Sequence, residues 1–399
     1  MTGDGLGIVE HGAVRVRGGR IAEVTDRAIR PEPAEREIDC GGCVVMPGFV
    51  DPHTHLVFGG WRAGEFEMRL AGRTYREIAE SGGGILSSVR STRAASEEEL
   101  YRSARARLRE MMSWGTTTVE VKSGYGLDTA TELKMLRVVR RLGQESPVTV
   151  VPTFLGAHSI PEERVRGSKG PRAKDEYVRL VIDEMMPRVA QEGLARYCDV
   201  FCENFLFDAA DSRRILEAGR RHGLAPKIHA DEIESSGGAE VAAEVAAVSA
   251  SHLLRPSDRG LRMMAEKGVV AELLPGTCFF LKEQARPPVG KMREYGISMA
   301  LGTDSNPGSS TVIGQPLTVV FACLEYGTTI VEAVRGVTVI AARAVGLEQE
   351  VGTLEPGKRA DIVVTDIPDY RHLAYRVGHN PCRVVISGGR VVHAQGEAG

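Results

Sequence analysis

Two histidines separated by one residue, His53 and His55, lie in the segment Asp51-Pro52-His53-Thr54-His55, at the end of an apolar run at residues 44–50. Side chains two residues apart on an extended strand point to the same side, so both imidazoles can bind one ion. Neutral imidazole is a ligand that zinc and iron accept in proteins. The pair therefore predicts half of a metal site, and the other ligands must come from elsewhere in the chain.

The elements that would position these histidines alternate along the sequence. Short segments rich in β-branched and apolar residues are separated by charged, amphipathic stretches that are typical of helices. Eight such repeats predict an α/β fold, with a parallel sheet closed into a (β/α)8 barrel. An open, doubly wound sheet is the alternative, but the Gly-rich phosphate turn that it normally carries is missing from the sequence. The expected strands are residues 44–50, 116–121, 148–155, 197–202, 226–228, 247–251, 269–274 and 298–302.

Both ends of the chain have a different pattern. Two pairs of short apolar segments are joined by the turns Gly18-Gly19 and Gly388-Gly389, as in β-hairpins. We expect the two β-rich ends to form one small β-sandwich side domain, built from residues 1–45 and 346–399, around a barrel of residues 46–345. The strands expected in it are residues 13–16, 20–24, 37–38, 361–364, 383–386 and 390–392.

Composition narrows the range of partners and locations. Fifty basic residues against 53 acidic ones give a formal charge of −3, which offers no attraction to nucleic acid or to an anionic membrane. No apolar run is long enough to span a bilayer. The first residues have neither the basic nor the apolar region of a signal peptide, and the seven cysteines are scattered. We expect a cytoplasmic protein that acts on a small molecule.

Histidines recur where the predicted strands end, which is where the active-site residues of a (β/α)8 barrel gather. The residues at these ends are His53, His55, His158, His229, His252 and Asp304. Three imidazoles and a carboxylate make a coherent shell for one divalent ion. The predicted ligands are His53, His55, His229 and Asp304.

Hydrolytic chemistry at such an ion needs further residues. Zinc lowers the pKa of bound water to about 7, which makes hydroxide available at neutral pH. A base and a polarising partner are then required, and Glu232 and His252 are the candidates. An ordinary acid at a helix N-terminus is the alternative interpretation of Glu232. The protons of the reaction could be carried by Glu232, His252 or Asp304.

Longer motifs around these residues resemble the imidazolonepropionase family of the amidohydrolase superfamily. Asp51–His55 and the tail at residues 352–361 mark only the superfamily, whereas three other motifs are much more specific. These are Phe58-Gly59-Gly60 with Arg62, Lys122–Leu127 and Thr303–Gly308. The resemblance implies hydrolysis of the imidazolone ring of 4-imidazolone-5-propanoate to N-formimidoyl-L-glutamate, in histidine degradation.

The resemblance also implies site residues and partners. The family's metal ligands fall on the same four residues as above, with one zinc or iron ion per chain, and a homodimer is the family expectation. Its substrate contacts fall on Arg62, Tyr125, His158, Glu232, Asn306, Gly308 and Ser309. A guanidinium binds a carboxylate through two parallel hydrogen bonds, so Arg62 suits the propionate. Ser309 stands where the family usually has threonine, which keeps the hydroxyl but loses a methyl group.

Two other classes of function are compatible with parts of this pattern. A related deaminase or another cyclic-amide hydrolase would use a similar barrel and metal site. Two-metal members of the superfamily usually carry a carboxylated lysine at the end of strand four, where this chain has Cys202-Glu203, so one metal is expected. A non-catalytic scaffold on the same fold would typically lack metal ligands, and here every ligand position is filled.

Overall fold

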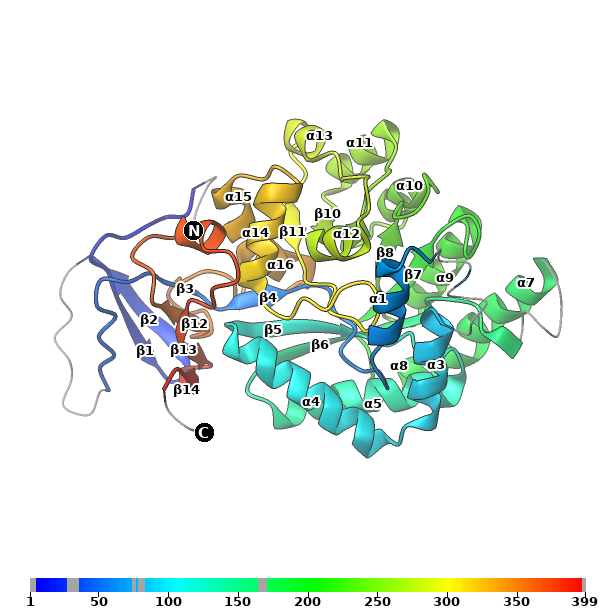
Figure 1. The fold of residues 1–399 in the computed structure, drawn as a ribbon, viewed down its shortest axis with the longest axis horizontal. Helices are drawn as coiled ribbons and strands as arrows, with labels where there is room; N and C mark the ends of the chain where they lie inside the picture. The colour runs from blue at the N-terminus through cyan, green and yellow to red at the C-terminus, as the bar shows by residue number, and fades with distance from the viewer. Residues whose placement is uncertain (1–4, 27–35, 74–76, 78–82, 164–170, 397–399) are drawn as a thin grey trace.

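Eight parallel strands form the centre of the molecule in this computed structural model, which describes residues 5–26, 36–73, 77, 83–163 and 171–396 (Figure 1). Each strand pairs with the next one along the chain, from β4 to β11. An isolated parallel bridge between Thr54 and Ser305 joins the first and last strands just beyond their ends. The predicted barrel is therefore confirmed. Its strands are β4 (Phe49–Asp51), β5 (Thr116–Lys122), β6 (Thr149–Ala157), β7 (Tyr197–Cys202), β8 (Ala225–Ala230), β9 (Ser249–His252), β10 (Val270–Leu273) and β11 (Met299–Leu301).

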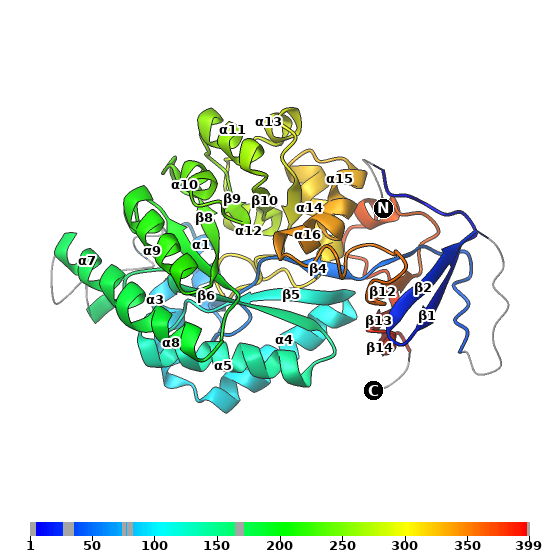
Figure 2. The same ribbon diagram turned by 180° about the vertical axis from the view of Figure 1, so that it is seen from behind.

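Helices surround the barrel on its outer side (Figures 1 and 2). Capping side chains mark where some of these helices begin. Helix α4, for example, starts after Ser96, which forms a capping box with Glu99. The helices are α1 (Ala63–Leu70), α3 (Ile85–Ala94), α4 (Glu97–Ser113), α5 (Thr129–Glu145), α7 (Pro171–Leu180), α8 (Met186–Gln191), α9 (Ala209–Arg221), α10 (Gly238–Glu244), α11 (Asp258–Lys267), α12 (Pro275–Leu281), α13 (Val289–Glu294), α14 (Gln315–Glu325), α15 (Ile330–Gly336), α16 (Val339–Ala344) and α17 (His372–Tyr375). None of the helices in the described ranges is long and apolar enough to cross a membrane.

One helical stretch differs from its sequence pattern. Residues 174–192 look like a single helix, but a turn of π-helix, η1 (Val181–Met185), separates α7 from α8. Pro187 lies in the first turn of α8. Because proline cannot donate a backbone hydrogen bond, it interrupts the regular α-helical pattern, and the wider turn lies directly before it.

Strands from both ends of the chain form the predicted side domain. The hairpin β1 (Ala13–Arg17) and β2 (Arg20–Thr25) packs through Ile21 against Ile362 of a four-stranded sheet and against Ala360, which precedes that sheet's strand. That sheet has the order β14-β13-β12-β3, so the β-sandwich is confirmed. The strand expected at residues 37–38 is absent, and β3 is the strand from the N-terminal end that pairs with β12. The sheet contains β3 (Val45–Pro47), β12 (Ile362–Thr365), β13 (Cys382–Ser387) and β14 (Arg390–Ala394).

The apolar run at residues 44–50 is two strands and not one. β3 belongs to the side domain and β4 to the barrel, and the chain passes between them at Gly48. A Cβ atom at Gly48 would lie 2.2 Å from Thr117 Oγ1, so only glycine fits where the run meets β5. The boundary predicted at residue 45 falls on the first residue of β3.

The interior of the barrel is charged. Five wholly buried ionisable side chains point into it from the strands, and we call them the buried charge cluster: Glu120, Lys122, Asp199, Lys227 and Glu272. Apolar side chains of the strands pack elsewhere. Phe154 belongs to a core cluster that includes helix residues such as Ile215. Tyr197 and Val270, each two residues before a member of the charge cluster, belong to another apolar cluster with residues of α16. The barrel thus places polar groups along its axis, directly beneath the ends of the strands where the histidines lie.

Candidate active site

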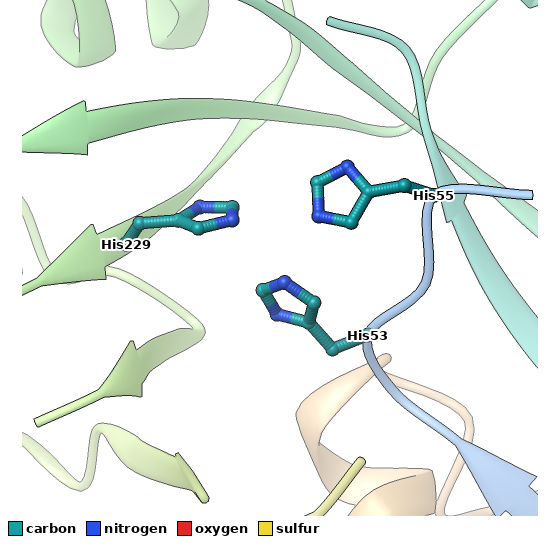
Figure 3. A group of neighbouring side chains, drawn as sticks. All are labelled: His53, His55 and His229. Carbon is teal, nitrogen blue, oxygen red and sulfur yellow. The ribbon is translucent and has the colours of Figure 1, made fainter. Parts of the chain in front are cut away.

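Three histidines converge at the mouth of the barrel, as predicted. His53 and His55 come from the segment after β4, and His229 comes from β8 on the opposite side (Figure 3). One ligand nitrogen from each ring can be chosen so that all three lie within 4.8 Å of one another. The rings of His53 and His229 have centroids 4.6 Å apart. All three side chains are buried.

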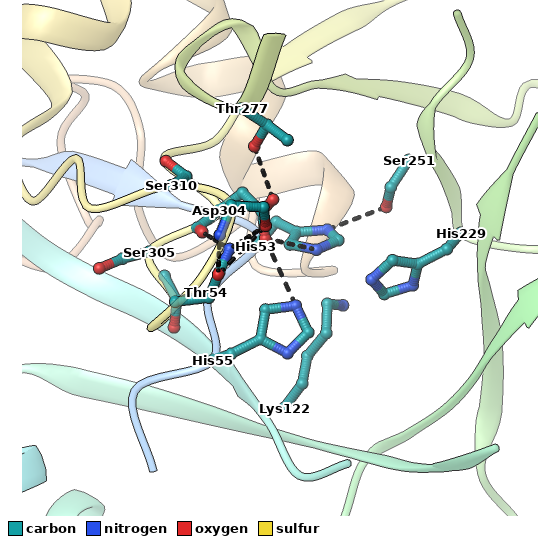
Figure 4. Close-up of polar contacts among 12 residues, drawn as sticks. His53, Thr54, His55, Lys122, His229, Ser251, Thr277, Asp304, Ser305 and Ser310 are labelled. Atoms are coloured by element: carbon teal, nitrogen blue, oxygen red, sulfur yellow. Dashed lines mark hydrogen bonds and ion pairs between the residues drawn. The ribbon is translucent and has the colours of Figure 1, made fainter. Parts of the chain in front are cut away.

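Asp304 joins the histidines from the segment after β11. Its Oδ1 lies 3.5 Å from Nε2 of His53 and 3.4 Å from Nε2 of His55. The Thr277 hydroxyl donates a 2.6 Å hydrogen bond to the other carboxylate oxygen (Figure 4). Burial alone would raise the pKa of Asp304, but the hydrogen bond and charge of His55 hold it below its usual range. Asp304 is therefore an ionised carboxylate beside the three imidazoles.

These four residues fit a metal ion. Three buried ring nitrogens, Nε2 of His53, Nε2 of His229 and Nδ1 of His55, have no hydrogen-bond partner among the described residues. Burial lowers the pKa of His53 well below its usual value and also lowers that of His55. Neutral rings keep the lone pairs that a metal requires. Unsatisfied buried nitrogens next to a carboxylate are the donor set that one divalent ion would complete.

Left-handed turns shape the mouth of the barrel. Asp231, His252 and Asp304 follow or end their strands with φ angles of 52°, 68° and 50°, which residues other than glycine rarely adopt. Such conformations persist only where the surroundings hold them. Here the backbone N–H of Asp304 donates to the carbonyl of His53, 3.0 Å away. The Asp231 carboxylate accepts from the N–H groups of Gly238 and Ala239 at the start of α10.

Glu232 and His252 lie together at the edge of the histidine group. Glu232 Oε2 is 3.5 Å from Nε2 of His252. Burial, followed by the charge of Asp304, raises the pKa of Glu232 to about 8, while burial lowers the pKa of His252 to about 3. No helix begins at Glu232, since α10 starts at Gly238, so the interpretation as a helix N-terminal acid is wrong. A buried carboxyl with a raised pKa beside a neutral histidine is suited to proton transfer.

An aromatic wall faces the other side of the histidine group. His158 stacks on His55 with ring centroids 5.1 Å apart and an angle of 15° between the planes. The Tyr125 ring contacts both, with centroids 5.9 Å from His55 and 5.4 Å from His158. Phe201 of β7, which we did not predict, lies 5.8 Å from the His229 ring. Tyr125 and His158 are thus at the site, where a planar ring could lie against them.

The loop after β11 forms a separate end of the site. Asn306 Oδ1 accepts hydrogen bonds from the backbone N–H groups of Gly308 and Ser309, each 2.8 Å long, and its amide nitrogen donates to the carbonyl of Asp304. The Asn306 side chain is therefore engaged in shaping the loop. Arg62 lies directly against this loop at Gly308, and its nearest carboxylate is that of Glu65, 3.8 Å away.

Several residues that contact the predicted ones were not found from the sequence. Asp199 Oδ1 lies 3.1 Å from Nδ1 of His229, and the Ser251 hydroxyl lies 3.0 Å from Nδ1 of His53. Arg69, in the last turn of α1, donates a 3.0 Å hydrogen bond to the carbonyl of Gly308. The signal for Asp199 was a single charge inside an otherwise apolar strand, which marks a side chain that faces the barrel axis.

Known proteins resemble this chain in sequence and in fold. Residues 44–392 match the Amidohydrolase family. Imidazolonepropionase from Geobacillus kaustophilus is 49% identical over 398 residues, which is 98% of this chain and 92% of the relative. The one from Myxococcus xanthus is 49% identical over 386 residues, covering 96% of this chain and 90% of the relative. The chain belongs to the imidazolonepropionase family.

Solved structures share the fold of this imidazolonepropionase family member. 5-Methylcytosine deaminase from Klebsiella pneumoniae superposes with a TM-score of 0.74 at 17% identity, covering 97% of this chain and 95% of that one. An adenosine deaminase from Xanthomonas campestris with bound zinc has a TM-score of 0.68 at 18% identity, with coverages of 96% and 88%. Amidohydrolases depend on metal, and the buried group of His53, His55 and His229 fits one.

Proposed function

We propose that this protein is a metal-dependent imidazolonepropionase. It would use water to cleave a ring C–N bond of 4-imidazolone-5-propanoate and release N-formimidoyl-L-glutamate, a step of histidine degradation that we place in the cytoplasm. The observation that carries the proposal is the buried group of three histidines at the mouth of the barrel. Near 49% identity over almost the whole chain to imidazolonepropionases supports the choice of substrate.

The proposed metal is one zinc or iron ion, held by His53, His55, His229 and Asp304. When bound, it supplies positive charge that activates water and polarises the ring carbonyl. The imidazoles of His53 and His55 remain neutral at physiological pH because burial lowers the pKa of both. Asp304 contributes the negative charge, and the Thr277 hydroxyl fixes the direction of its carboxylate.

Proton transfer is assigned to Glu232, with His252 beside it. Ionised Glu232 would take a proton from the attacking water and pass it to the ring nitrogen that leaves. A pKa raised to about 8 makes the protonated form of this acid readily available, as delivery to the leaving nitrogen requires. Neutral His252, 3.5 Å from Glu232, would orient the attacking oxygen or stabilise the developing charge.

Binding of the substrate divides between two regions. Tyr125 and His158 would contact the planar ring, because both lie against His55. Arg62 would bind the propionate, since a buried guanidinium Nε without a hydrogen-bond partner among the described residues lies beside the loop after β11. Gly308 and Ser309 lie in that loop, and Asn306 holds its shape. In this proposal, Asn306 acts mainly by positioning its neighbours.

A homodimer is also proposed. Large apolar side chains are exposed on α12, α14 and the end of α17, and α14 contacts both of the other helices. Phe279 is 54% exposed, Leu324 72% and Tyr375 80%. Covering this surface with a second copy would remove apolar area from water. Light scattering should then give twice the chain mass of 43.1 kDa, and Leu324→Glu should reduce it to one chain.

The test of the activity is an assay on freshly generated imidazolone propionate with metal analysis of the same preparation. We expect one ion per chain and an open-chain formimidoyl product without ammonia, because the bond that breaks lies within the ring. A deaminase would release one ammonia per turnover. Stoichiometric ammonia, or no turnover with metal present, would contradict the proposed reaction, and two ions per chain would contradict the single-ion site.

A further inference from the structure

The buried charge cluster lies directly beneath the three histidines, and none of its members has a role in the function proposed above. All five side chains are wholly buried. Burying charges is costly unless each is paired, so a cluster of this size requires specific contacts. Those contacts connect the cluster to two of the proposed metal ligands.

The first connection reaches His229. Asp199 Oδ1 lies 3.1 Å from Nδ1 of His229, and Asp199 Oδ2 lies 2.9 Å from the ammonium of Lys122. Burial alone would raise the pKa of Asp199, but His229 and Lys122 hold it well below its usual value. Asp199 is therefore an ionised acceptor facing the back of the His229 ring.

The second connection reaches His53. The Ser251 hydroxyl lies 3.0 Å from Nδ1 of His53 and donates a 2.8 Å hydrogen bond to Glu272 Oε2 (Figure 4 shows the contact of Ser251 with His53). The same carboxylate oxygen lies 3.4 Å from Nδ1 of His53. The ammonium of Lys227 is 2.7 Å from the other oxygen, Glu272 Oε1.

Glu120 joins the two connections across the barrel. Its Oε1 is 2.8 Å from the Lys122 ammonium and 3.9 Å from that of Lys227. Alternating acids and lysines thus run without a break from behind His229 to behind His53. Each lysine has a carboxylate on either side, which fixes the position of both carboxylates that face a histidine.

The rings of His53 and His229 use their two nitrogens in the same way. His53 and His229 each direct Nδ1 to an acceptor of the cluster, and in each ring it is Nε2 that lacks a hydrogen-bond partner among the described residues. A ring that donates through Nδ1–H keeps its lone pair on Nε2. The contacts therefore select the same tautomer in both rings.

We propose that Asp199 and Glu272 are positioning residues for the metal site. Asp199 orients His229, and Glu272 orients His53 directly and through Ser251, while the two lysines and Glu120 hold both carboxylates in place. This inference rests on the proposed metal site. If the cluster served only to fill the barrel, substituting its members would change the stability of the fold and leave metal affinity unchanged.

The test is zinc affinity of the purified full-length protein, measured by competition with a chromophoric chelator well below the melting temperature. Asp199→Asn and Glu272→Gln should each weaken zinc binding about 10- to 100-fold, which is the usual cost of removing such a partner. Ser251→Ala should cost less than Glu272→Gln, because the carboxylate still lies 3.4 Å from His53.

Glu132→Gln is the matched control. Glu132 is also a wholly buried carboxylate, but it accepts from the backbone N–H groups of Gly124, Gly126 and Leu127 and contacts none of the proposed ligands. It should lower the melting temperature and leave zinc affinity unchanged. Equal zinc affinity in all the folded variants, or an equal loss in Glu132→Gln, would overturn the inference. If Asp199→Asn fails to fold, Ser251→Ala and Glu272→Gln decide the question.

A wild-type protein that binds no zinc or iron would contradict the proposed metal site itself. A wild-type protein that binds the metal tightly, with Glu272→Gln and Ser251→Ala indistinguishable from it, would contradict only the positioning role. The two failures are thus separated within one titration series.

Discussion

The guanidinium of Arg62 occupies the space that a side chain at Gly308 would need. A Cβ atom added at Gly308 would lie 1.1 Å from Nη2 of Arg62. The φ angle of Gly308 is not in the left-handed region, so the restriction comes from this contact and not from the backbone. Gly308 therefore allows Arg62 to lie against the loop that follows β11.

Gly308→Ala should displace Arg62 and raise KM for the substrate, while metal content stays at the wild-type level. Gly290→Ala is the control, because a Cβ there meets no atom within 4 Å. Steady-state kinetics with metal analysis checks the prediction. A KM equal to that of Gly290→Ala would show that displacing Arg62 does not affect substrate binding.

Arg62→Ala should reduce kcat/KM by about 10- to 150-fold, because a charge-assisted hydrogen bond contributes about 1.5–3 kcal/mol. Combining Arg62→Ala with Gly308→Ala should cost little more than Arg62→Ala alone, since both changes remove the same contact. Fully additive losses would show that the two residues act independently. An unchanged kcat/KM in Arg62→Ala would place the carboxylate site elsewhere.

Glu232→Gln should retain the metal and lower kcat by about 10²- to 10⁴-fold, the usual contribution of a general base. Glutamine keeps the size and the hydrogen-bonding reach of the side chain but cannot accept the proton. Single-turnover measurements would separate this loss from slow product release. Near-normal turnover would remove Glu232 from the mechanism.

The pH profile should reflect the same carboxyl group. Burial and the charge of Asp304 raise the pKa of Glu232 to about 8. A general base acts in its ionised form, so kcat/KM should rise with pH until Glu232 is ionised. A bound cation favours that form, so the midpoint should lie at or below about 8. This rise should vanish from the residual activity of Glu232→Gln, and its persistence would assign the titration to another group.

The sequence predicted best what depends on strand periodicity. Alternation along one strand placed His53 and His55 together, and the rule that barrel sites lie at strand ends placed His229 and Asp304 beside them. The sequence did not distinguish β3 and β4 from a single strand, because residues 44–50 are apolar on both sides of Gly48. Gly48 becomes special only through its contact with Thr117, which is distant in sequence.

Contacts inside the barrel were harder to predict. Which charges face one another across a closed sheet depends on its register, and a shift of one residue reverses every side chain. Asp199 and Glu272 therefore could not be matched to His229 and His53 from spacing alone. Asn306 was predicted at the site, but its engagement with Gly308 and Ser309 depends on the three-dimensional shape of the loop.

Because the chain runs from the side domain into the barrel at Gly48, the side domain should affect how firmly the proposed metal is held. β3 pairs with β12 in the side domain, and the same uninterrupted backbone continues through β4 to His53. Gly48 itself donates a 2.8 Å hydrogen bond to the carbonyl of Asp361. The side domain thus holds the strand that leads to His53, a proposed metal ligand, and disrupting the pairing of β3 with β12 should leave His53 less firmly positioned. Metal retention would then report on the integrity of a sheet that contributes no ligand of its own.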